Sequence, residues 1–180
     1  LTAPLWGRLS DKIGRRPVLL VSLFGLSLSY LLMSSAQNLL SLFIARAIAG
    51  LMAGNISAAF AYVADITTPQ NRAKGMGLIG AAFGIGFIIG PAIGGVLAGS
   101  DPAHANYQMP ALIAAIASGL AFFISLIFLT ESLTVEMRNS RLNEPTTKIF
   151  DMFRQATSQK EVLVLLIVSF LVIFVFASLE

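Results

Sequence analysis

Long apolar segments alternate with short polar ones along the chain. Apolar stretches cover residues 17–36, 39–66, 75–99 and 109–130, and another begins near Val162. A helix needs about 20 mostly apolar residues to cross the hydrocarbon core of a bilayer, and each of the four complete stretches reaches that length. The pattern therefore predicts an all-α integral membrane protein, built as a multi-pass helical bundle.

The basic residues follow the same alternation. Segments 7–16, 67–74 and 131–161 contain four, two and five Lys or Arg residues, which is eleven of the twelve in the chain. The connections 37–38 and 100–108 contain none. Because cytoplasmic loops of membrane proteins are enriched in Lys and Arg, we expect the three basic segments to be cytoplasmic. The location that we expect is a plasma membrane, the inner membrane in bacteria.

Composition supports a lipid-embedded protein and removes other classes. Hydrophobic residues make up 56% and charged residues 12% of the 180 residues, whereas soluble domains have roughly 25% charged residues. The mean hydropathy is +0.82. The net charge of +3 does not indicate nucleic acid, because membrane topology already accounts for where the basic side chains stand.

No pattern predicts catalysis, a nucleotide or a metal. The stretch "GMGLIG" (75–80) matches a dinucleotide-binding glycine pattern, but a polar loop rather than a strand precedes it. His104 is the only histidine, Asp101 is the only acid near it, and the chain has no cysteine, so a metal site is not expected. We therefore expect no enzyme activity, no cofactor and no resident metal.

Arg46 is the only basic residue inside an apolar stretch. It lies about 10 Å along a helix from Leu39, where an arginine costs about 2.5–3.5 kcal/mol on insertion scales. At about 100° per residue, Gly50 and Ser57 share its face. An arginine on a face of small residues is typical of proton coupling or of a substrate cavity. The alternative is a side chain that snorkels to the outer headgroups in a structural role.

Residues 75–99 contain nine of the fifteen glycines. Gly86, Gly90 and Gly94 recur every four residues, a spacing that lets a second helix approach closely. Pro91 removes one backbone hydrogen bond and bends the helix. The segment is either a moving contact between two helical bundles or a static packing surface, and the sequence favours neither.

Five charged residues belong at the same cytoplasmic depth. Asp65 ends the second complete span, and Asp11, Arg15, Arg16 and Arg72 flank the spans on the same side. Opposite charges from distant parts of the chain can form a network there. The alternative is a set of independent, solvated charges, in which exposed pairs contribute under about 1 kcal/mol each.

These residues resemble motifs of the major facilitator superfamily. "GRLSDKIGRRPVL" (7–19) is similar to the family's cytoplasmic loop between the second and third helices, and "ARAIAGLMAGN" (45–55) to its fourth-helix motif. "GFIIGPAIGG" (86–95) resembles the antiporter motif of the fifth helix. "AYVADITTPQNRAKGMG" (61–77) and "ES" at 131–132 resemble the drug:proton antiporter branch, especially the tetracycline-efflux type. The matching positions of the loop motif are Gly7, Asp11, Gly14, Arg15, Arg16 and Leu19. Arg46 matches the arginine of the fourth-helix motif, and the antiporter-type motif contains Gly86, Gly90, Pro91, Gly94 and Gly95.

The resemblance implies a fragment of a twelve-helix transporter. Residues 1–130 correspond to part of the N-terminal six-helix bundle, from the end of the second helix to the sixth. Residues 131–161 correspond to the cytoplasmic central loop, and 162–180 to the start of the seventh helix, in the C-terminal bundle. Within the loop, "TTKIFDMFRQA" (146–156) gathers its apolar residues mostly on one helical face, which predicts a short amphipathic helix. The alternative is a linker.

The resemblance also implies a function. It is secondary active transport by alternating access, with proton-coupled efflux of small amphipathic compounds or drugs. The partners are then a small-molecule substrate, protons, the lipid bilayer and the C-terminal half of the same chain. Arg15 pairs with Asp65, and Asp11 meets the other half, in a cytoplasmic contact that holds in one state of the cycle. The alternatives are a symporter or facilitator that takes up a metabolite, and a non-transporting membrane scaffold.

Ser29, in "LSLSYLL", departs from the tetracycline-efflux pattern, which has an intramembrane aspartate at this position. That acid is implicated in transport by those pumps. The sequence therefore identifies neither tetracycline as the substrate nor the carboxylate that carries the proton.

Overall fold

The computed structural model describes residues 3–99, 101, 105–134, 138 and 160–178, and the regular elements in these ranges are helical. They are α1 (Ala3–Ile13), α2 (Arg15–Ser34), α3 (Leu39–Met52), the 3₁₀ helix η1 (Ala53–Asn55), α4 (Ile56–Ile66), α5 (Arg72–Ala98), α6 (Gln108–Phe128) and α9 (Lys160–Ser178). The chain forms two compact units, Leu1–Leu142 and Asn143–Glu180, and α9 belongs to the second. The amphipathic helix predicted for 146–156 lies outside the described residues.

Four helical segments are long and apolar enough to cross a membrane: Arg15–Ser34, Leu39–Ile66, Arg72–Ala98 and Gln108–Phe128. Each agrees within three residues at either end with an apolar stretch expected from the sequence. The predicted all-α, multi-pass fold class is therefore confirmed. In the second unit, Val162–Leu171 of α9 is an apolar helical segment.

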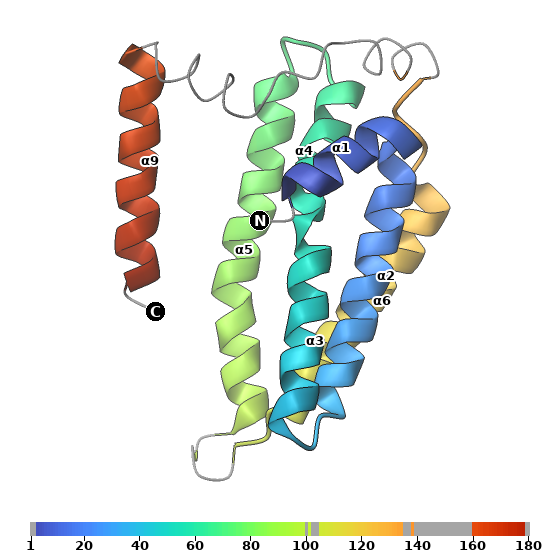
Figure 1. The fold of residues 1–180 in the computed structure, drawn as a ribbon, viewed down its shortest axis with the longest axis vertical. Coiled ribbons are helices and arrows are strands. Elements are labelled where there is room, and N and C mark those ends of the chain that lie inside the picture. The colour runs from blue at the N-terminus through green and yellow to red at the C-terminus, as the bar shows by residue number, and fades with distance from the viewer. Residues whose placement is uncertain (1–2, 100, 102–104, 135–137, 139–159, 179–180) are drawn as a thin grey trace. The chain divides into compact units, whose positions relative to one another are not determined.

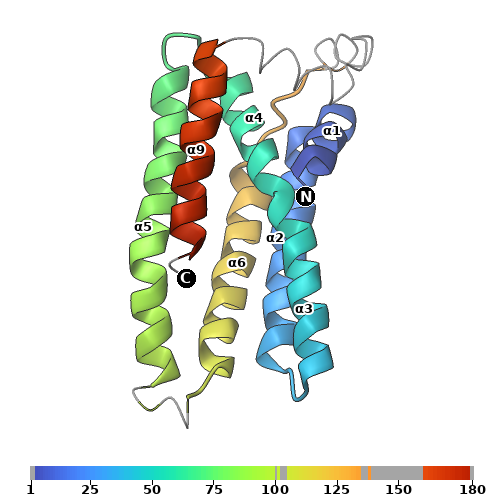
Figure 2. The same cartoon turned by 60° about the vertical axis from the view of Figure 1, so that its left-hand side comes forward.

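Helix α2 packs against both α3 and α6 (Figure 1, Figure 2). Its serines bond to the backbones of these neighbours: Ser27 Oγ donates to Ala115 O of α6 at 2.9 Å, and Ser29 Oγ donates to Ala45 O of α3 at 3.2 Å. A Cβ at Gly119 of α6 would lie only 3.2 Å from Ser27 Oγ, which is tighter than an ordinary contact. Small residues thus make the close helix contacts, as expected where lipid is the solvent.

Large apolar side chains point outward rather than inward. Phe43, Ile88 and Val96 are 65%, 77% and 83% exposed. The buried side chains among the described residues are mostly alanine and serine, and comprise Ser10, Arg15, Val18, Leu19, Ser22, Ser29, Ala45, Ala58, Ala111, Ala115 and Leu133. This distribution is the reverse of a soluble core and fits a surface that faces hydrocarbon.

A 3₁₀ segment interrupts the second span. Helix α3 ends at Met52, η1 follows, and α4 starts at Ile56. From α1, Trp6 Nε1 donates a hydrogen bond to Leu51 O at 2.6 Å, just before this interruption. A 3₁₀ helix has 3.0 residues per turn instead of 3.6, so three such residues rotate the following helix by about 60° relative to a continuous α-helix.

Cysteine labelling tests the orientation. Gln37 lies in the turn between α2 and α3, Gln70 lies between α4 and α5, and both are exposed. In intact cells that express the full-length protein without other cysteines, Gln37→Cys should react with a membrane-impermeant maleimide. Gln70→Cys should react only after permeabilisation, because its segment carries the cytoplasmic positive charge. Reaction of Gln70→Cys in intact cells would contradict the assignment.

The Trp6 hydrogen bond can be removed while an aromatic ring is kept. Trp6→Phe should still pack against the cluster of Val18, Leu19 and Ala58, but should lose about 1 kcal/mol of stability with the bond to Leu51 O. The midpoint of thermal unfolding of the full-length protein in detergent should therefore fall. Tyr107→Phe alters an aromatic side chain that is 72% exposed and serves as the control. An unchanged midpoint for Trp6→Phe would show that the bond does not stabilise the fold.

Candidate functional site

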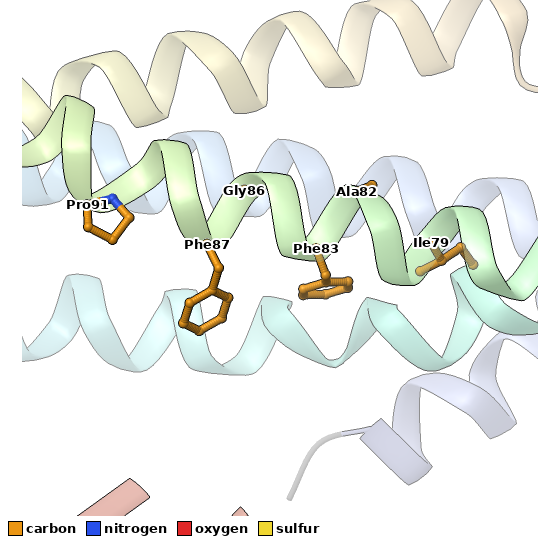
Figure 3. A pocket seen from close by; sticks show the side chains of 6 residues that line it. All are labelled: Ile79, Ala82, Phe83, Gly86, Phe87 and Pro91. Carbon is orange, nitrogen blue, oxygen red and sulfur yellow. The ribbon is translucent and has the colours of Figure 1, made fainter. Parts of the chain in front are cut away.

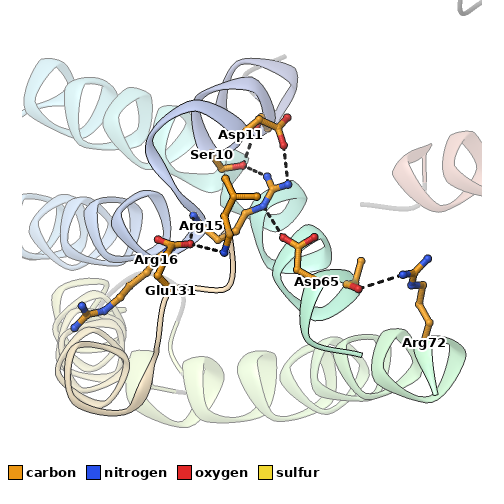
Figure 4. A network of polar contacts seen from close by, with 10 residues as sticks. Ser10, Asp11, Arg15, Arg16, Asp65, Arg72 and Glu131 are labelled. Atoms are coloured by element: carbon orange, nitrogen blue, oxygen red, sulfur yellow. Dashed lines mark hydrogen bonds and ion pairs between the residues drawn. The ribbon is translucent and has the colours of Figure 1, made fainter. Parts of the chain in front are cut away.

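A glycine turn brings Arg15 into the protein interior. Helix α1 ends at Ile13 and α2 begins at Arg15. Between them, Gly14 has a φ of 112°, which side-chain-bearing residues rarely adopt. The side chain of Arg15 is only 3% exposed and points between α1 and α4 (Figure 4).

Three oxygens from two other helices hold the guanidinium of Arg15. Its Nε donates to Asp65 Oδ2 of α4 at 3.1 Å, and its Nη2 donates to Asp11 Oδ1 of α1 at 2.6 Å. Its Nη1 donates to Ser10 Oγ, and this hydroxyl donates in turn to Gly7 O at 2.7 Å. Ser10, Asp11, Arg15 and Asp65 are termed the Arg15 cluster below.

Burial decides which contact of the Arg15 cluster has the largest effect on stability. The side chain of Asp65 is 4% exposed and that of Asp11 is 39% exposed. Exposed pairs contribute under about 1 kcal/mol, whereas removing one partner of a buried pair costs about 3–5 kcal/mol, because the remaining charge has no partner. The Arg15–Asp65 pair therefore holds α2 against α4. Its burial distinguishes it from an independent, solvated charge pair.

The other two predicted arginines bind backbone carbonyls at helix ends. Arg16 Nη2 donates to Leu126 O of α6 at 2.9 Å, and Arg72 Nη2 donates to Ala64 O of α4 at 3.3 Å. Both carbonyls lie in the last turn of their helices, where the negative end of the helix dipole attracts cations. These arginines thus attach α2 and α5 to the cytoplasmic ends of neighbouring helices.

Gly7 and Ser57 meet where α1 contacts α4. A Cβ at Gly7 would lie 3.7 Å from Ser57 Oγ, and this hydroxyl donates to Gly54 O at 3.0 Å. Ser57 therefore faces α1, although a continuous helix would place it on the face of Arg46. The rotation of about 60° at η1 accounts for this difference. Gly50 is exposed, and neither Gly50 nor Ser57 lines the groove that contains Arg46.

Arg46 lies in an open groove at the other end of the bundle. Helix α2 starts at the Arg15 cluster and ends at this groove, which α3 and α6 complete. The groove has a volume of ≈ 660 Å³. Its polar lining residues are Tyr30, Gln37, Asn38, Arg46, Tyr107 and Gln108. Arg46 is exposed, and no Asp or Glu stands among the described residues that line the groove, so its charge is positive.

Within the described residues of the first unit, the glycine face of α5 has no neighbour. No residue of α5 is buried, and a Cβ at Gly86, Gly90, Gly94 or Gly95 would meet nothing within 4 Å. Along this helix an apolar groove of ≈ 650 Å³ is lined by Ile79, Ala82, Phe83, Gly86, Phe87 and Pro91 (Figure 3). The close helix approach expected from the glycine spacing is thus not made by the described helices of the first unit, and stays a prediction.

Sequence reasoning did not assign two residues that the structure places in this region. Ser10 is 0% exposed and binds Arg15, although its position offered no signal beyond its nearness to Gly14. The dipeptide at 131–132 resembles the family pattern, but the sequence assigned Glu131 no role. In the structure, its carboxylate accepts a hydrogen bond from the backbone N–H of Arg15. Over the described part of the chain, no three His, Cys, Asp or Glu side chains gather as metal ligands would.

Comparison with known proteins identifies the family. The profile of the Major Facilitator Superfamily matches residues 1–180. The chain is 43% identical over 155 residues to tetracycline resistance protein, class E, of Escherichia coli, with 83% of this chain and 37% of that protein covered. It is 39% identical over 138 residues to major facilitator superfamily domain-containing protein 10 of Homo sapiens, with 77% and 29% covered.

A solved structure supports the same assignment. The crystal structure of the human organic anion transporter MFSD10 (TETRAN) matches with a TM-score of 0.67 and 35% identity, over 76% of this chain and 30% of that one. The chain thus spans between 29% and 37% of the length of these relatives. Its four spans and its bacterial tetracycline resistance relatives confirm the expected multi-pass location in a plasma membrane, the inner membrane in bacteria. The chain belongs to the Major Facilitator Superfamily of membrane transporters.

Proposed function

We propose that this chain forms part of a secondary active transporter that exports small amphipathic compounds in exchange for protons by alternating access. Tetracycline resistance proteins among its relatives support export. The observation that carries the proposal is the Arg15 cluster at the cytoplasmic end of the bundle, in which the buried Arg15–Asp65 pair lies beside the partly exposed Asp11. Two halves that rock about a central site need contacts that form in one state and break in the other.

The Arg15 cluster suits such a contact because its members differ in exposure. The side chains of Arg15 and Asp65 are almost completely shielded from solvent, so their ion pair holds α2 and α4 in fixed positions relative to one another. The side chain of Asp11 is 39% exposed. In the full-length protein, the exposed side of Asp11 meets the C-terminal half when the cytoplasmic side is closed. The buried pair then forms the rigid platform, and Asp11 makes the contact that changes.

Arg46 provides the charge for binding substrate or for proton coupling. An arginine inside a span normally faces protein or a water-filled cavity, and here it faces an open groove. Its planar guanidinium can hold a carboxylate through two parallel N–H bonds. Because the described lining of this groove contains no acid, the carboxylate that exchanges the proton comes from another part of the full-length protein.

A transporter of organic anions is the second candidate. The positive charge of the Arg46 groove favours an anionic substrate, and a relative of known structure is an organic anion transporter. A metabolite symporter or facilitator would use the same helical architecture. If the protein were a non-transporting scaffold, substitution of Arg46 would change neither substrate flux nor proton flux.

Flux measurements with Arg46 variants separate these functions. In proteoliposomes with the full-length protein, tetracycline and fluorescein serve as probe substrates. Arg46→Gln should lower substrate-linked proton flux about tenfold or more, because a lost bond to a charged group costs about 1.5–3 kcal/mol. Arg46→Lys should retain part of the flux, since it keeps the charge but not the planar fork.

The control for these variants is Arg8→Gln, which removes an exposed positive charge from α1. Proton flux linked to tetracycline supports the first candidate. Fluorescein transport without proton flux supports the second. If Arg46→Gln matched the wild-type protein with both probes, Arg46 would have only a structural role.

A charge swap tests the Arg15–Asp65 pair. Arg15→Asp and Asp65→Arg each place like charges together at a buried site, which should cost about 3–5 kcal/mol and slow transport severely. The double variant restores opposite charges and should recover part of the rate, and the double-mutant cycle isolates this coupling. Lys12→Asp, at an exposed position, is the control. Transport rate and membrane protein level are measured together. A double variant as inactive as Arg15→Asp at equal protein level would remove support for the pair.

A further inference from the structure

Glu131 lies at the start of α2, although it follows α6 in the sequence. Helix α6 ends at Phe128. Oε1 of Glu131 accepts a hydrogen bond from the backbone N–H of Arg15 at 2.9 Å, and Oε2 accepts one from the backbone N–H of Arg16 at 3.2 Å (Figure 4). Oε1 also accepts the N–H of Leu133 at 3.1 Å, which orients the carboxylate.

Helix α2 has no cap of its own. The first four N–H groups of a helix have no acceptor within that helix, and a Ser, Thr, Asp or Asn side chain at the N-cap usually provides one. Here the N-cap is Gly14, which makes no side-chain hydrogen bond, and the first turn has no acidic residue. Arg15 and Arg16 instead place positive charge near the positive end of the helix dipole. Glu131 provides both the missing acceptor and a negative charge.

Gly14 is required by this arrangement for two separate reasons. Its φ of 112° disfavours any residue with a side chain. A Cβ at this position would also lie 2.9 Å from Cδ of Glu131 and would collide with Oε2. The glycine therefore makes the turn and also leaves the space that the carboxylate occupies.

A second hydrogen bond joins the same two helices in the opposite direction. Arg16 Nη2 donates to Leu126 O in the last turn of α6. The segment that leaves α6 thus caps α2, while the first turn of α2 binds the end of α6. That first turn also carries Arg15, whose guanidinium is buried against Asp65. A displacement of Glu131 would therefore shift the backbone of Arg15, and with it the guanidinium in the Arg15 cluster.

The geometry points to Glu131 as a positioning residue for the Arg15 cluster. It caps α2 from a position 116 residues later in the chain. It fixes the backbone of Arg15, and it couples the exit of α6 to the charge network. The inference deepens the proposed function and rests on it, because the Arg15 cluster that Glu131 positions includes Asp11, whose contact is proposed to differ between transport states. The positioning itself does not depend on transport activity.

Labelling of a buried cysteine tests the positioning directly. Val18 lies in the first turn of α2 and is 0% exposed. In the full-length protein without other cysteines, the reaction of Val18→Cys with N-ethylmaleimide reports opening of this turn. Glu131→Ala should raise the labelling rate about tenfold, because two charge-assisted hydrogen bonds are lost. Glu131→Gln should raise it less, because the amide keeps one acceptor oxygen.

The matched control is the neighbouring Ser132→Ala, since the Ser132 hydroxyl has no partner in the described structure. Its labelling rate should equal that of the wild-type protein. If Glu131→Ala impairs folding, Glu131→Gln still provides the test, because it differs from glutamate by one polar group. Labelling rates for the Glu131 variants equal to that of Ser132→Ala would overturn the inference.

Gly14→Ala provides an independent test of the geometry. With Glu131 present, the added methyl group meets both the unfavourable φ and the carboxylate. In the Glu131→Ala background only the unfavourable φ remains. Gly14→Ala should therefore raise the labelling rate by a larger factor in the wild-type background than in the Glu131→Ala background. Equal factors would show that Glu131 does not occupy the space beside Gly14, and would overturn the inference.

Tetracycline-linked proton flux in proteoliposomes distinguishes failure of this inference from failure of the proposed function. Glu131→Gln should lower the maximal rate and leave the half-saturating tetracycline concentration unchanged, because Glu131 is not in the Arg46 groove. A wild-type protein that moves neither tetracycline nor fluorescein would overturn the proposed function, while the labelling result would still decide the positioning. Faster labelling of Glu131→Gln with an unchanged maximal rate would overturn the link between positioning and transport.

Discussion

The buried guanidinium of Arg15 constrains the whole cytoplasmic end of this protein. A charge that is removed from water must be met by opposite charge and by hydrogen bonds. Arg15 finds these partners on α1 and α4, so three helices must hold fixed positions around one side chain. The glycine turn at Gly14 separates α1 from α2, so that Arg15 at the start of α2 meets Asp11 of α1 and Asp65 of α4.

In lipid, apolar burial distinguishes one helix arrangement from another only weakly, since hydrocarbon solvates leucine as well as a protein interior does. Close backbone approach and hydrogen bonds between helices therefore decide the packing. Ser27 and Ser29 attach α2 to opposite neighbours through backbone carbonyls. Helix α5 differs, because its glycine face has no neighbour among the described residues of the first unit and its large side chains are exposed.

The two ends of the bundle differ in a way that suits transport. At the cytoplasmic end, Arg15 is buried and bound by several partners, and these bonds oppose movement of the surrounding helices. At the other end, Arg46 is exposed in a groove without described acids and can interact with a ligand. Helix α2 runs from one region to the other. Its capping by Glu131 adds a connection to the segment that follows α6.

The sequence by itself determined the spans, their orientation and the family, because hydropathy, loop charge and short motifs are local properties of the chain. The resemblance also implied the Arg15–Asp65 pair. Tertiary structure alone decided the contacts of Trp6 and Glu131, which join residues 45 and 116 positions apart and leave no periodic signal. It also decided that Ser57 faces α1 instead of sharing the groove of Arg46. Helical periodicity could not show this, because the 3₁₀ turn at η1 changes the rotation per residue midway through the span.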